Sequence, residues 1–147
     1  MERIALEVTS YFPPRVVKVR KTDRIAINDP IWEVLEVFAE VPEHPFAPNL
    51  LKHEHLFGER LGTADSGMGN HLLEIHDLDA VLKLIEDGDR KWQEFVAQLP
   101  EEVEVRCWEC GRVVGRKKIS TKSLLDVYRF YGIPLEEQLN PTGYCGC

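Results

Sequence analysis

The chain has 147 residues, of which 44% are hydrophobic and 29% charged, and its net charge is −7. This length fits one domain, or a small domain with an appended module. No apolar run approaches the ~20 residues that a membrane-spanning helix needs, so we expect no membrane partner. Few methionines among many charged side chains are typical of a thermophilic source.

Charge is unevenly distributed along the chain. Residues 1–28 carry a net charge of +3 and residues 102–147 a net charge of +1, whereas residues 29–60 and 61–101 carry −5 and −6. An acidic middle suits a basic protein surface better than it suits nucleic acid. The pattern therefore favours a protein partner, although acidity is also common in soluble proteins for solubility alone.

The first 28 residues predict an antiparallel sheet. Residues 3–8 alternate loosely between apolar and polar, and Pro13-Pro14 ends that segment. Residues 16–20 and 24–27 then predict a hairpin that turns at residues 21–23. Apolar side chains of both strands share one face, so we expect a half-buried sheet with a basic outer side.

Residues 29–40 predict an acidic helix. Asp29-Pro30 is a typical start, with a capping carboxylate followed by proline at the first helical position. The charged side chains that follow, Glu33, Glu36 and Glu40, recur at helical spacing beside a wide apolar face. We therefore expect an acidic stripe on this helix, available to a basic partner.

The middle of the chain predicts several short helices around one strand. Residues 50–57 predict a short helix, and residues 71–76 predict the strand. Residues 77–86 and 89–99 predict two more helices, separated at Gly88.

The loop of residues 62–70 and the nearby histidines are the candidates for catalysis. The loop contains Gly-x-Gly but lacks the lysine and hydroxyl of a Walker loop, so a flexible connection is the simpler interpretation. His53 and His55 are two residues apart, and on a helix that spacing directs their side chains apart. The alternative function is a small metal-dependent hydrolase or nuclease that uses His53, His55, His71, Asp65 or Glu54.

The last third of the chain predicts a hairpin followed by a helix. Residues 102–106 and 113–119 predict the two strands. Residues 121–131 predict the helix, which starts after a hydroxyl cap and ends at Gly132. A short turn at residues 135–139 then leads to the C-terminus.

Four cysteines lie in this last third, Cys107 and Cys110 in CWEC and Cys145 and Cys147 in CGC, with 34 residues between the pairs. This spacing matches a four-thiolate metal site, and structural Zn²⁺ takes four such ligands in a tetrahedron. The run CWECG between two strands resembles the zinc knuckle of zinc ribbons and rubredoxin-like modules over residues 103–147. The second pair departs from that pattern, because it is Cys-x-Cys and follows a helix. The resemblance implies structural zinc.

Disulfides, a redox pair, iron and a catalytic thiol are the alternatives for these cysteines. Disulfides suit secreted proteins, but Met1 leads directly into a strand without a signal peptide, so we expect reduced thiols in the cytoplasm. A thioredoxin-type pair would open a helix, whereas Gly111 and a basic, β-branched stretch follow here. A catalytic thiol needs a partner, and no histidine lies near these cysteines in the sequence.

Two features beside the cysteines could bind a partner. Trp108 could protrude as an interface anchor, or it could fold over the metal or pack on the final helix. The basic flank consists of Arg112, Arg116, Lys117, Lys118 and Lys122. It could bind nucleic acid, or it could offset the net charge of about −2 that four thiolates and Zn²⁺ carry together.

The sequence therefore predicts an α+β fold. We expect an antiparallel sheet packed against several short helices in residues 1–101, and a zinc-stapled hairpin-plus-helix module in residues 102–147. The alternative is a single domain that includes both. The expected function is a non-enzymatic regulatory protein that docks on a larger protein target. Zinc-ribbon-like modules recur in transcription and nucleic-acid machinery, so by analogy we expect a subunit or inhibitor of such machinery.

Overall fold

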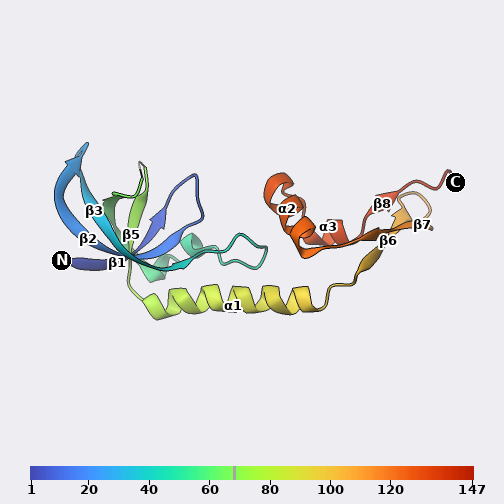
Figure 1. Ribbon diagram of the computed structural model, residues 1–147, viewed down its shortest axis with the longest axis horizontal. Helices are drawn as coiled ribbons and strands as arrows, with labels where there is room; N and C mark the ends of the chain where they lie inside the picture. The colour runs from blue at the N-terminus through green and yellow to red at the C-terminus, as the bar shows by residue number, and fades with distance from the viewer. Residues whose placement is uncertain (68) are drawn as a thin grey trace. The chain divides into compact units, whose positions relative to one another are not determined.

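The computed structural model describes residues 1–67 and 69–147. The chain forms two compact units. The N-terminal unit comprises Met1–Glu43 and Ala47–Asp89, and the C-terminal unit comprises His44–Phe46 and Arg90–Cys147. The α+β class is confirmed, since the described residues form two sheets and few helices (Figure 1). No described helix is long and apolar enough to cross a membrane.

The N-terminal unit is built around a closed five-stranded barrel (Figure 1). Its strands, in barrel order, are β1 (Glu2–Val8), β2 (Arg15–Ala26), β3 (Asp29–Glu40), β4 (Phe57–Ala64) and β5 (His71–Ile75). All neighbouring strands are antiparallel except β3 and β4, which pair in parallel through only two residues each. Two 3₁₀ turns, Leu50–Lys52 and Glu54–Leu56, precede β4 where the sequence predicted one short helix.

Two hydrophobic clusters stabilise this unit. One cluster takes side chains from all five strands and fills the barrel: Ala5, Val17, Val19, Trp32, Ala64 and Leu72. The other lies between the barrel's outer face and the helical segments: Leu6, Val16, Val41, Leu50, Leu56, Ile75, Val81 and Ile85. Successive strand residues point to opposite faces, which is why Ala5 and Leu6 belong to different clusters. Each fully buried aliphatic side chain contributes roughly 1.5–3 kcal/mol.

The predicted helix at residues 29–40 is wrong, because this segment is strand β3. Its register against β2 shifts three times, and at two of these shifts Phe38 and Leu35 are the extra residues on β3. Each bulge adds one residue to the period-two spacing of a strand. The three glutamates are consequently three and four residues apart, which imitates a helix. The bulges also mean that Glu33 and Glu36 share one face of β3, whereas Glu40 points to the other.

The turn before β3 also differs from the prediction. Strand β2 continues through residues 21–23, where Thr22 Oγ1 donates to Ile31 O at 2.8 Å. The chain instead reverses at Ile27 and Asn28, which join the paired residues Ala26 and Asp29. Both turn residues have positive φ, 48° and 66°, as in a type I′ hairpin turn. Asp29-Pro30 therefore follows a hairpin turn rather than capping a helix.

Gly62 lies where β3 and β4 close the barrel. A Cβ at this position would lie 2.3 Å from Pro30 O, and the backbone has a φ of +152°. Only glycine tolerates both conditions. Residues 62–64 thus belong to β4, and the predicted loop of residues 62–70 is shorter than expected. Within that loop, residue 68 lies outside the described residues.

Helix α1 (Leu78–Ala97) is continuous, so the predicted break at Gly88 is wrong. Glycine costs a helix interior only about 1 kcal/mol relative to alanine, and Gly88 is buried. The predicted start is confirmed, because Ala80 N–H donates to Asp77 Oδ1 at 3.0 Å.

The C-terminal unit contains a three-stranded sheet in the order β7-β6-β8. Its elements are β6 (Glu102–Cys107), β7 (Val113–Lys118), α2 (Thr121–Tyr131), α3 (Leu135–Leu139) and β8 (Thr142–Gly143). The predicted hairpin and helix are confirmed. Ser120 Oγ accepts from Ser123 N–H at 3.1 Å, and Gly132 ends α2 in the left-handed conformation.

Candidate metal centre

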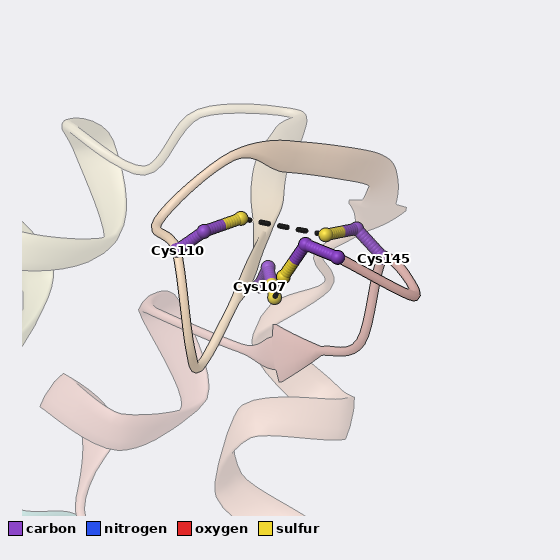
Figure 2. Close-up of side chains that lie close together, drawn as sticks. Cys107, Cys110 and Cys145 are labelled. Atoms are coloured by element: carbon purple, nitrogen blue, oxygen red, sulfur yellow. Dashed lines mark hydrogen bonds between the residues drawn. The ribbon is translucent and has the colours of Figure 1, made fainter.

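The first cysteine pair lies on a tight turn at the end of β6. Gly111 N–H donates to Cys107 O at 2.8 Å, and Cys107 N–H donates to Arg112 O at 2.7 Å. Gly111 has a φ of +76°, a conformation that glycine adopts readily, and it allows the backbone to turn beneath the cysteines. The turn directs the side chains of Cys107 and Cys110 toward one region (Figure 2).

Strand β8 brings the second cysteine pair to the first. It lies parallel to β6, with Arg106 N–H donating to Pro141 O at 3.2 Å and Trp108 N–H donating to Gly143 O at 3.0 Å. Tyr144 separates the end of β8 from Cys145. The chain then turns at Gly146, which has a φ of +79°, and ends at Cys147.

The four sulfur atoms lie within 4.8 Å of one another. Cys110 and Cys145 Sγ are 3.3 Å apart (Figure 2). Cys107 and Cys147 Sγ are 3.8 Å apart. A tetrahedral ion with metal–sulfur bonds of about 2.3 Å places its ligand sulfurs about 3.8 Å apart. All four cysteines are free, and these separations far exceed a disulfide bond of ~2.05 Å. The cluster could therefore hold one metal ion.

The thiols of this cluster differ in acidity. Hydrogen bonding from the backbone of Cys110 lowers the pKa of Cys107 to about 6. Hydrogen bonds to the thiols of Cys147 and Cys110 raise the pKa of Cys145 to about 12. Closely spaced thiols share charge in this way because a second thiolate beside the first is repelled.

An exposed aromatic pair lies beside the cysteine cluster. Trp108 is 68% exposed, and its ring stacks on Tyr144 with centroids 5.5 Å apart and planes at 23°. Tyr144 also donates from its hydroxyl to Cys147 O at 3.2 Å. The sequence prediction missed Tyr144, although it adjoins Cys145 as Trp108 adjoins Cys107. Trp108 therefore protrudes with one face on Tyr144 and the other available.

Glutamates of β6 lie opposite part of the basic flank. Every residue of β7 is exposed, and β7 lies at an edge of its sheet. Glu104 of β6 pairs in register with Arg116, and Glu102 with Lys118. Arg106 bonds to Gly111 O at 3.1 Å and to the Glu104 carboxylate. This mixture of charges is less suited to nucleic-acid phosphates than an uninterrupted basic strip.

The three glutamates of the predicted acidic stripe lie in the N-terminal unit on β3. Glu33 accepts from Arg20 Nη2 at 2.9 Å. Glu36 pairs in register with Lys18, and Glu40 with Arg15. Cations of β2 thus lie opposite glutamates of β3 on both faces of this hairpin.

The histidines are spread over the described structure. The rings of His53 and His55 are 6.1 Å apart, and His71 Nδ1 lies 2.8 Å from Arg60 Nη2. His44 is buried and stacks on Trp92. Within residues 1–67 and 69–147, the cysteine cluster is the single group of three or more potential ligands close enough for a metal. No structural observation thus favours the hydrolase alternative.

Glu7 is a buried carboxylate that the sequence prediction missed. It is 2% exposed at one end of the barrel, and accepts from Arg15 Nε at 2.7 Å, Asn70 Nδ2 at 3.0 Å and Ser66 Oγ. Burial raises the pKa of Glu7, but the hydrogen bonds from Ser66, Asn70 and Arg15 outweigh it and lower the pKa overall. Glu7 thereby holds the loop after β4 against the barrel.

No protein-family model, curated protein or solved structure matches this chain.

Proposed function

We propose that this protein is a non-enzymatic binding protein whose C-terminal unit is stabilised by one structural Zn²⁺. The observation that carries this proposal is the convergence of four cysteine sulfurs within 4.8 Å. Four thiolates in a tetrahedron are the preferred ligands of structural zinc. Because all four positions are taken by cysteine, such a site leaves none open for water or substrate, so its role is architectural.

The C-terminal unit has a small hydrophobic core, which a bound ion would supplement. Among the described residues, its buried hydrophobic side chains are only Trp92, Cys107 and Leu124. Its third strand, β8, has two residues. A metal ion would join β6, the turn after it and the last three residues. It would supply stability that so small a core does not, because zinc binding and folding are coupled in such modules.

The proposed partner is a larger protein, contacted through Trp108 and Tyr144. Exposed tryptophan and tyrosine side chains are the usual anchors of protein interfaces. The glutamates opposite Arg116 and Lys118 favour protein over nucleic acid. The zinc-ribbon resemblance makes transcription and nucleic-acid-processing machinery the first target class to test, by analogy.

Metal analysis tests the zinc site. We expect the purified protein to contain one zinc per chain by inductively coupled plasma mass spectrometry. Cys145→Ser should lose most of that zinc, because serine is a poor zinc ligand. Trp108→Ala is the matched control beside the site and should retain it. A zinc-free wild-type protein, prepared without chelators, would exclude the structural-zinc proposal.

Affinity capture from the source cell tests the docking role. We expect a defined protein captured by the wild type to be lost with Trp108→Ala/Tyr144→Ala, while zinc content stays at one per chain. Phe130→Ala, which removes an exposed aromatic side chain from α2, is the control. Equal capture by all three proteins would show that the aromatic pair is not the docking surface.

A further inference from the structure

Strand β3 has an unpaired edge in the N-terminal unit. On the side away from β2 it pairs with β4 only at Ile31 and Trp32. Asp65 extends this contact by one step, since its N–H donates to Trp32 O at 2.9 Å and its Oδ1 accepts from Val34 N–H at 3.3 Å. Beyond Val34, none of the described strands pairs with this edge. We call residues 35–40 the β3 edge.

The β3 edge exposes large apolar side chains. Leu35, Val37 and Phe38 are 36%, 42% and 36% exposed. Bulges at Leu35 and Phe38 are a common protection of strand edges against chance pairing, and so are charged side chains. Protection against chance pairing does not explain why three neighbouring apolar side chains are exposed to solvent. A group of exposed apolar side chains is typical of an interaction surface.

Two glutamates of the β3 edge have no cation of their own. The side chains of Glu36 and Glu40 are exposed and make no hydrogen bond or ion pair with any residue that the structure describes. Their cross-strand neighbours are engaged elsewhere, Lys18 with Glu2 at 3.7 Å and Arg15 with the buried Glu7. The edge therefore presents negative charge at both of its faces, beside apolar side chains.

We propose that the β3 edge binds an extended, basic segment of a partner protein, which carries lysine or arginine on both of its faces and apolar residues between them. An extended segment laid beside an open strand directs successive side chains to alternate faces. Basic side chains would meet Glu36 on one face and Glu40 on the other, and apolar side chains would cover Leu35, Val37 and Phe38. The proposal builds on the proposed docking role and names a second surface and the chemistry of what it binds.

The test uses a fluorescein-labelled peptide, Lys-Val-Lys-Val-Val-Lys-Val-Lys, and the full zinc-loaded chain. Its lysines fall on both faces of a strand, and its sequence is the same in both directions. We expect saturable binding by fluorescence anisotropy at physiological salt. The same peptide with glutamate in place of lysine should not bind.

The variant Glu36→Lys/Glu40→Lys should weaken binding at least about tenfold, because it replaces attraction with repulsion. The matched control is Glu54→Lys/Glu86→Lys, which changes the same charge at exposed positions of the same unit away from the edge. It should change affinity by less than about twofold. The peptide should also slow hydrogen exchange of the amides of residues 35–40.

Three results would overturn the proposal: no binding of the basic peptide, equal weakening by both charge variants, or exchange protection away from residues 35–40. Greater self-association of the edge variant without any loss of peptide binding would show that the glutamates only protect the edge. Failure of this proposal can be distinguished from failure of the proposed function. Zinc content and the effect of Trp108→Ala on partner capture test the C-terminal unit, and neither measurement depends on β3.

Discussion

The two units of this protein are stabilised in different ways. The N-terminal unit has two hydrophobic clusters and a buried, fully hydrogen-bonded carboxylate. The C-terminal unit buries few apolar side chains and has four cysteines at metal-binding distance. Hydrophobic burial is spread over many residues, whereas a metal site concentrates stability in four. The difference predicts that single changes will affect the two units unequally.

Zinc removal should produce the largest difference between the units. Zinc binding contributes apparent free energies of about 10–16 kcal/mol in zinc-finger peptides, so chelation or Cys107→Ser should unfold the C-terminal unit. Hydrogen exchange followed by mass spectrometry should show loss of protection in β6, β7 and α2, with the barrel amides unchanged. Loss of protection in β1 to β5 as well would mean that the barrel depends on the metal. Unchanged protection in both units would mean that neither unit depends on the metal.

Gly62→Ala should destabilise the N-terminal unit alone. The added Cβ would lie 2.3 Å from Pro30 O in a backbone conformation that favours glycine. Separation of β3 from β4 should cost about 2–4 kcal/mol, read as a lower urea midpoint of the barrel. Gly69→Ala is the control, because Gly69 also has positive φ but no atom within 4 Å of the added Cβ. Gly69→Ala should lower the free energy of unfolding by only about 1 kcal/mol. If both substitutions destabilised the unit equally, backbone strain alone, and not the contact with Pro30 O, would explain the loss.

The same contrast governs what could be predicted from sequence. In the C-terminal unit the signals are local: a cysteine pair followed by Gly111, a serine cap and Gly132 each act within a few residues. The cysteine cluster, the hairpin and α2 could therefore be predicted. In the barrel the decisive features depend on neighbouring strands. The bulges at Leu35 and Phe38 exist only relative to β2, and they turned a strand pattern into a helical one.

Glu7 could not be predicted for the same reason. Its partners Ser66 and Asn70 lie 59 and 63 residues away in the chain, and no local pattern indicates that they meet. Tyr144 is a different case, since its position beside a cysteine was visible, but the stacking on Trp108 depends on β8 lying parallel to β6. Long-range strand pairing is therefore the missing information in both examples.

Acid should weaken the barrel through Glu7. The folded state lowers the pKa of this carboxyl, so its stabilising contribution is present above the unfolded value of about 4.3 and is lost as pH falls through the folded pKa. Glu7→Gln should cost about 1–3 kcal/mol at neutral pH and should flatten this part of the acid dependence. Urea midpoints from neutral pH to pH 3 would measure both. An unchanged acid slope in Glu7→Gln would assign the dependence to other carboxyls.

Ile27→Asn should give the smallest effect and the opposite sign. Ile27 is 98% exposed and has a φ of 48°, a conformation that β-branched residues adopt with strain and asparagine adopts readily. No packing is lost, so relief of strain should stabilise the barrel by about 1 kcal/mol, measured as a higher urea midpoint. Ile25→Asn is the control: Ile25 is also exposed on this hairpin but belongs to β2, where asparagine is disfavoured. Equal effects of the two substitutions would show that loss of exposed apolar surface, and not the turn, accounts for the change.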